Sequence, residues 1–286
     1  MPDINQYSDI SGYVQTVYDE AMFVARENVL VANLVRVFND RDSQATRTNS
    51  RYAGTITLTS VGDTDDLTSQ AFNPETYKSI TPAEYAGQVF ITDKRLRNDP
   101  FGAAEDTRNE FGLAQAAHIE RALIGNFSSL TGGTIGGGGT APKWSTWYAA
   151  LAAVRRTNRA GSWVAVMHPD AWYHLGTAAA LQGNVSQANA PDFQNDVMRS
   201  FWMGRANGID IYTSTYCASG GTSIYGAIFD REAIALDLRV PFTIEPERDA
   251  SRRGWELNAS LTYGHGVWRP EYGVCLLGDV TTPTGA

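Results

Sequence analysis

Cysteine is scarce in this sequence, since Cys217 and Cys275 are the only two among 286 residues. Two cysteines do not make a disulfide framework, and cytosolic thiols usually stay reduced. We therefore expect both side chains to pack in the core as free thiols. The first residues also lack the basic and then apolar regions of a secretory signal, which favours a protein that is made and used in a cytosol.

Long apolar runs and an excess of basic residues are missing as well. No run approaches the roughly 18 apolar residues that a transmembrane helix needs, so we expect no membrane contact. The 23 lysines and arginines are outnumbered by 31 acidic residues, which gives a net charge of −8. Tight binding to a phosphate backbone normally needs a clustered basic surface. The charge disfavours such binding but is compatible with a protein that lies beside DNA and repels it.

Recognisable catalytic and cofactor motifs are absent from the sequence. There is no Gly-x-Ser-x-Gly elbow, and the glycine-rich stretch 128–142, which we expect to be a flexible loop, is not followed by the Gly-Lys-Ser/Thr of a phosphate-binding loop. His168 and His174 lie six residues apart, whereas a helical zinc pair needs a spacing of four. Because an enzyme needs at least one convincing constellation, the sequence predicts no catalysis, no cofactor and no metal.

What the sequence does contain is a mixture of helical and strand patterns without a regular strand–helix repeat, which is typical of the α+β class. Helical periodicity is found over 12–38, 100–125, 144–154, 170–179, 193–203 and 230–236. Strand patterns are found over 55–61, 75–80, 85–91, 163–167, 208–212, 223–229, 241–244, 255–263 and 274–277.

The longest well-delimited helical pattern, over 100–125, predicts a spine helix. Asp99 is the expected N-cap, Pro100 the first helical residue, and Gly125 the stop signal. The first half of the helix is much more polar than the second, so we expect that half at a surface or an interface. The expected buried side consists of Leu113, Ala116, Ala117, Leu123 and Ile124.

Upstream of the helix lies a polar, β-prone stretch over 51–80 that cannot bury a core of its own. Residues 55–61 alternate Thr and Ser with apolar residues, and 75–80 provide a second strand across the turn cluster at 62–66. A lone hairpin is marginal in water. We therefore expect this hairpin to be either mobile or docked on another subunit.

A dense charge cluster precedes the strand at 255–263. It consists of Glu245, Glu247, Arg248, Asp249, Arg252 and Arg253. Two interpretations remain open. The cluster is either a solvated turn or an ion-pair patch between subunits that sets their register.

The order of these elements resembles the major capsid proteins of tailed bacteriophages, whose fold also occurs in encapsulin shells. The resemblance covers roughly 50–278, and the order of the motifs makes it specific. The matching segments are YAGQVFITDKRL at 85–96, AQAAHIERAL at 114–123, WVAVMHPDAW at 163–172, GIDIY at 208–212, the strand-rich stretch 224–236, the strand 255–263 and WRPEY at 268–272.

The resemblance implies a chain of five parts. These are an N-terminal arm over 1–50, an extended loop over 51–84, a peripheral domain over 85–182 that holds the spine helix at 100–125, an axial domain over 183–245, and return strands of the peripheral domain with a C-terminal tail over 246–286. The chain lacks the long N-terminal extension of members with a fused scaffold, so a separate scaffolding protein is implied.

The resemblance also implies a structural protein that self-assembles, through pentamers and hexamers, into an icosahedral shell around double-stranded DNA. The shell would be a virion capsid that is assembled in the host bacterial cytoplasm, with a portal and a possible decoration protein as further partners. The alternatives are an encapsulin-like shell that stores a cargo enzyme and an unrecognised enzyme with a surface flap. The expected intersubunit contacts are Thr55, Thr57, Thr59, Tyr77, Lys78, Glu105, Arg108, Glu110, Arg248, Arg252 and Arg253.

Overall fold

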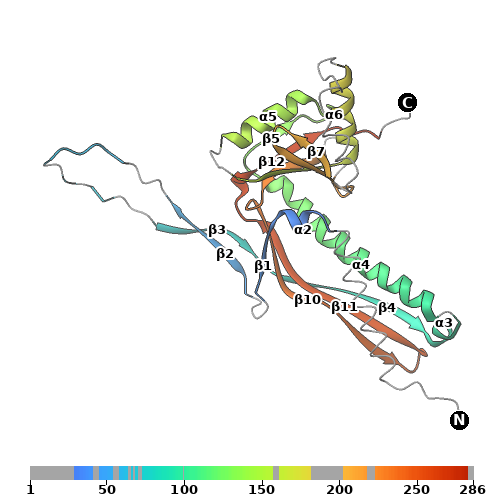
Figure 1. The fold of residues 1–286 in the computed structure, drawn as a ribbon. Helices are drawn as coiled ribbons and strands as arrows, with labels where there is room; N and C mark the ends of the chain where they lie inside the picture. Colours follow the sequence, from blue (N-terminus) through green and yellow to red (C-terminus); the bar gives the residue numbers. More distant parts are fainter. Residues whose placement is uncertain are drawn as a thin grey trace, which may run out of the picture.

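The structure is a computed structural model that describes residues 29–40, 45–53, 58–63, 66, 68–69, 73–98, 100–156, 161–181, 202–217 and 223–282. It consists of three parts (Figure 1). A compact part of helices and strands lies at one end. An elongated layer, in which a long helix runs along a sheet, extends away from it. A thin hairpin projects from the side of this body.

The elongated layer contains a four-stranded sheet in the order β1-β10-β11-β4. β10 (Ile234–Asp249) and β11 (Gly254–Val267) form a long antiparallel hairpin. β4 (Ala83–Thr92) pairs antiparallel with β11, and β1 (Arg36–Asn39) pairs in parallel with β10. The predicted strands at 85–91, 241–244 and 255–263 are confirmed, each as part of a longer strand.

The predicted spine helix is confirmed as α4 (Pro100–Gly125), which lies along this sheet (Figure 1). Of its expected buried side, Ala116, Leu123 and Ile124 are buried and Ala117 is partly buried, but Leu113 is 43% exposed. Glu120 follows Leu113 by seven positions, about two helical turns, so both lie on one side of the helix. The short helix α2 (Val31–Leu34) covers that side around Glu120, and the described residues do not continue over Leu113.

The compact part is built on a six-stranded sheet with two helices packed against it. The helices are α5 (Trp144–Arg155) and α6 (Pro169–Leu181). Trp147 and Val154 of α5 share a buried cluster with Met167 of the central strand. The strand order is β5 (Thr134–Gly136), β12 (Gly273–Gly278), β9 (Ser223–Asp230), β6 (Trp163–Met167), β8 (Ile209–Thr213) and β7 (Trp202–Ala206).

The strand pairings correct the predicted division of the chain. β6, from the predicted peripheral stretch 85–182, pairs with β8 and β9 from the predicted axial stretch 183–245. β12, from the predicted return strands at 246–286, pairs with β9 in the same sheet. Conversely, β10 begins in the predicted axial stretch and lies in the elongated layer. The compact part and the elongated layer are therefore each built from segments that alternate along the chain.

The predicted helix at 230–236 is wrong. Asp230 instead closes a tight turn, in which its side chain accepts a hydrogen bond from the backbone of Glu232 at 3.0 Å and its carbonyl accepts one from Ala233 at 2.8 Å. From Ile234 onward the backbone pairs with β11, starting opposite Val267. Pairing with a strand distant in sequence overrides the local helical pattern.

Other boundaries also differ from the predictions. The helical pattern at 12–38 ends in α2 and β1, and its residues up to 28 lie outside the described part. The pattern at 193–203 lies outside it up to residue 201, and 202–203 begin β7. The stretch 128–142 was expected to be a loop, but it contains β5 and the end of a 3-10 helix, η1 (Asn126–Ser129). No helix among the described residues has both the length and the apolar character needed to cross a membrane.

Candidate assembly surfaces

The projecting hairpin consists of β2 (Arg47–Ala53) and β3 (Asn73–Ile80), which pair antiparallel from Arg47↔Ile80 to Ala53↔Asn73 (Figure 1). The predicted strand at 75–80 is confirmed. The predicted partner strand at 55–61 is wrong in its described part, because residues 58–61 belong to no strand. The partner strand lies earlier in the sequence, at Arg47–Ala53.

The far end of this hairpin, which we call the flap tip (58–69), exposes apolar side chains. Leu58 is 96% exposed and Val61 is 47% exposed. All other tip residues whose burial the structure describes are exposed as well. Large apolar side chains on a projecting segment are typical of a contact surface, because burial against a partner removes them from water.

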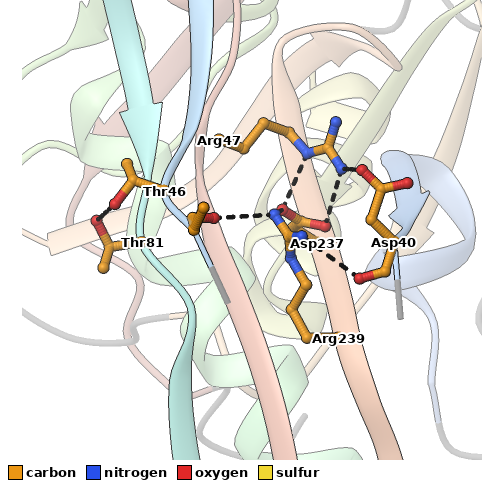
Figure 2. Close-up of polar contacts among 7 residues, drawn as sticks. Asp40, Thr46, Arg47, Thr81, Asp237 and Arg239 are labelled. Carbon is orange, nitrogen blue, oxygen red and sulfur yellow. Dashed lines mark hydrogen bonds and ion pairs between the residues drawn. The ribbon is translucent and has the colours of Figure 1, made fainter. Parts of the chain in front are cut away.

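The base of the hairpin is tied to the body by a buried ion network, which Figure 2 shows. Asp237 of β10 has no exposed surface. Its carboxylate accepts a hydrogen bond from Arg47 Nε at 2.9 Å and another from Arg239 Nη2 at 2.7 Å. Arg47 also donates to Asp40, and Arg239 donates to the carbonyl of Ala45 at 3.2 Å. The bond to Asp237 is the main reason that the pKa of Arg47 lies above its ordinary value.

Two further contacts hold the hairpin base. The Asn49 amide donates to the Trp268 carbonyl at 2.7 Å in a buried position. Ile80, only 1% exposed, packs with Ala235 and Trp268. The base therefore belongs to the folded body, whereas the flap tip carries the exposed apolar side chains.

The predicted contact residues of the flap lie at different depths. Thr59 is exposed in the flap tip. Lys78 is partly buried on β3 opposite Asn49. Thr55, Thr57 and the side chain of Tyr77 lie outside the described part. These residues remain predicted contacts.

The predicted contacts on α4 lie in its first half. Glu110 is exposed there, and the side chains of Glu105 and Arg108 lie outside the described part. A groove of about 560 Å³ begins on the next turn, between α4 and β4. Most of its lining is apolar or aromatic, and it consists of Tyr85, Ala114, Ala117, His118, Arg121, Ala122 and His265.

Arg248, at the end of β10, is paired within its own chain. Its guanidinium forms an ion pair with Asp93 at 2.8 Å and donates to the Gly254 carbonyl at 2.8 Å. It also lies 5.4 Å from the centre of the Trp255 ring. Asp93 begins helix α3 (Asp93–Asn98), so these contacts tie the β10–β11 turn to the end of β4.

The turn between β10 and β11 is stabilised in the same way. Arg252 pairs with Glu256 at 2.7 Å. The Ser251 hydroxyl and the Arg252 backbone donate to Asp249 and hold the pKa of that carboxyl below its usual range. Arg253 is exposed in the left-handed region, with φ 53°. The internal pairs favour the solvated-turn interpretation, and a role for these arginines between subunits remains a prediction.

Sequence reasoning missed Glu120, which lies on α4 with 1% of its surface exposed. Its Oε1 accepts hydrogen bonds from the backbone N–H groups of Leu30 and Val31, each at 2.6 Å. Burial raises the pKa of Glu120 to about 7.

Cys217 and Cys275 are buried free thiols, as predicted. Burial and, to a smaller extent, the charge of Glu120 raise the pKa of Cys217 to about 12.

Solved structures that match this fold include phage capsids and a virus-like particle. The capsid of Ralstonia phage GP4 matches with a TM-score of 0.65 and 10% identity, over 88% of this chain and 89% of that chain. The capsid of Cyanophage P-SCSP1u matches with a TM-score of 0.64 and 15% identity, again over 88% and 89%. A virus-like particle from Pyrococcus furiosus matches with a TM-score of 0.62 and 10% identity, over 92% and 99%.

These matches confirm the α+β capsid fold that the sequence resemblance implies. No curated protein matches the sequence. A family model described as phage capsid protein matches residues 75–276, which is well over half of the chain. The chain therefore belongs to the phage capsid protein family.

Proposed function

We propose that this major capsid protein builds an icosahedral shell around double-stranded DNA by laying each flap tip on a neighbouring subunit. The observation that carries the proposal is the contrast within one hairpin. Its base is fixed by the buried network around Asp237, whereas Leu58 at its tip is 96% exposed. A fixed base aims the tip at a position outside the subunit, and burial there would stabilise both partners.

The groove between α4 and β4, together with the polar first half of α4, is the proposed seat for the neighbour's flap tip. Ala114, Ala117 and Ala122 leave room on the helix surface, and the aromatic ring of Tyr85 offers apolar contact. The contact joins two different surfaces, so it is heterologous. Heterologous contacts close into rings when the rotation between subunits allows, as pentamers and hexamers require.

The net charge of −8 supports a shell that encloses DNA without gripping its phosphates. We infer no catalytic activity and no cofactor. The other proposed partners follow from the family resemblance and are a separate scaffolding protein, a portal and a possible decoration protein. Assembly is proposed to take place in the host bacterial cytoplasm.

A shell that stores a cargo enzyme is the second candidate, because the virus-like particle from Pyrococcus furiosus shares the fold over 92% of this chain. The contents of particles purified from the native source distinguish the two functions. Packaged double-stranded DNA supports the viral capsid. A co-purified enzyme without DNA supports the storage shell.

Removing the flap tip tests the assembly mechanism. Residues 54–72 are replaced by Asn-Gly, which keeps β2 and β3 and closes them with a two-residue turn. We expect unchanged circular dichroism and thermal unfolding of the subunit, but no shells by electron microscopy. The deletion stops short of Ile80 because that side chain is part of the core.

A point variant serves as the finer version of this experiment. Leu58→Ser combined with Val61→Ser removes the apolar side chains of the tip, and Ser60→Ala on the same exposed segment is the matched control. The double variant should assemble poorly and the control normally. Normal shells from the deletion variant, or loss of its fold, would contradict the division between a folded base and a contact tip.

A further inference from the structure

The described chain begins beside a buried carboxyl group. Glu120 of α4 receives the backbone N–H groups of Leu30 and Val31, about 90 residues earlier in the sequence, on its Oε1 atom. Its Oε2 atom is buried and has no hydrogen-bond partner among the described residues. Val31 and Val35 are fully buried immediately afterwards. The arm segment, which we define as residues 29–35, is thus held on α4 by a half-satisfied carboxyl group.

Among the described residues, no cationic side chain forms an ion pair with Glu120. The thiol of Cys217, in the turn after β8, lies close enough for the Glu120 charge to raise the pKa of that thiol. On α4 itself, the neighbouring Arg121 faces the ring of Tyr216 at 5.2 Å, and His118 is hydrogen-bonded to Tyr263 at 2.7 Å. The arm segment contributes backbone N–H groups to the contact.

We propose that Glu120 is a proton-dependent latch, which holds the arm segment on α4 tightly when its carboxyl group is protonated and loosens when the proton leaves. Docking of the arm segment removes the carboxyl group from water, and a buried anion with one unpaired oxygen is costly. Protonation cancels the charge while Oε1 still accepts both N–H bonds. Docking and proton uptake therefore favour each other.

The opposite behaviour is physically conceivable, and the structure discriminates against it. The backbone N–H groups of Leu30, Val31 and Ala32 stabilise the ionised form and would by themselves make docking stronger at high pH. Loss of water around the carboxyl group outweighs them, because Glu120 is only 1% exposed and its Oε2 atom has no partner among the described residues. The pKa of Glu120 accordingly rises from 4.5 to about 7. With the segment released, the carboxyl group regains water and an ordinary pKa. Docking should then weaken as the pH rises, with most of the change below about pH 7.

Hydrogen exchange of the arm segment tests the latch in the full chain. Exchange at Leu30 and Val31 is measured by mass spectrometry and corrected for the intrinsic effect of pH. Protection factors should fall about tenfold between pH 6 and pH 8, as linkage with a docked pKa of about 7 requires. Glu120→Gln, which mimics the protonated group, should remain protected and lose this pH dependence.

Glu110→Gln, an exposed position on the same helix, is the matched control and should behave as the wild type. Protection that is constant or rises with pH in the wild-type chain would overturn the proposal. So would a Glu120→Gln variant that keeps the wild-type pH profile. If the variant does not fold, the wild-type profile alone decides. The proposal concerns contacts within one subunit, so it stands whether or not the flap tip drives assembly.

Discussion

At the level of single residues, Asp237 is a fully buried carboxylate that is hydrogen-bonded to two arginines. Buried charges are tolerated when they are paired and hydrogen-bonded, and removing one partner strands the other. Arg239 is itself only 4% exposed. The network therefore fixes where the hairpin leaves the body. Its charged residues should in turn tolerate substitution poorly.

We predict that Asp237→Asn lowers the free energy of unfolding by about 3–5 kcal/mol, because it leaves Arg239 charged in a buried position. Chemical denaturation of the unassembled subunit measures the loss. Asp210→Asn is the matched control, because Asp210 pairs with Arg205, whose side chain is 63% exposed. That change should cost much less, because solvent screens an exposed ion pair. Equal losses in the two variants would contradict a special role for the buried network.

At the level of elements, those with a strong local sequence pattern were predictable, and those whose position depends on distant contacts were not. The spine helix was predictable from its capping residues and its length, and β11 from its alternation of apolar and polar residues. β2 has no comparable pattern, because its position depends on Arg47 and Asn49, whose partners Asp237 and Trp268 lie 190 and 219 residues away. A local sequence pattern gives no information about partners that lie so far away in the sequence.

The close contact between β9 and β6 gives a prediction for an element. A Cβ atom added at Gly226 would lie 2.5 Å from the Val166 carbonyl oxygen and 2.8 Å from Met167 Cβ. Gly226→Ala should therefore destabilise the compact part by about 1–3 kcal/mol. Gly176→Ala, on α6 with nothing within 4 Å, is the control and should stabilise by up to about 1 kcal/mol. Thermal unfolding measures both changes, and the same sign for the two would refute the packing argument.

At the level of the whole molecule, the fold was more predictable than the candidate contacts. The order of elements pointed to the capsid fold, which the family match and the solved structures bear out. Contacts between subunits depend on a surface that a single chain does not contain. Arg248 and Arg252 illustrate the difficulty, because both have partners within their own chain. Glu120 was hidden because its role depends on the fold around it rather than on any motif.

The net charge gives a prediction for assembly. Subunits of charge −8 repel one another, and salt screens this repulsion over about 8 Å at physiological ionic strength. Assembly of purified subunits, followed by light scattering, should accelerate between about 50 and 300 mM sodium chloride. The variant with Leu58→Ser and Val61→Ser should stay unassembled across this range. Assembly that slows with salt would indicate that attraction between opposite charges dominates instead.

The β10–β11 hairpin has a mechanical consequence. Its 16-residue first strand starts next to the compact part and ends in the turn that holds Arg252, about 50 Å away at roughly 3.3 Å per residue. A ribbon of this length acts as a lever. A rotation of about 5° where it leaves the compact part would displace its far end by about 4 Å. A small rotation at one end of the subunit would thereby produce a displacement of several ångströms at the other end.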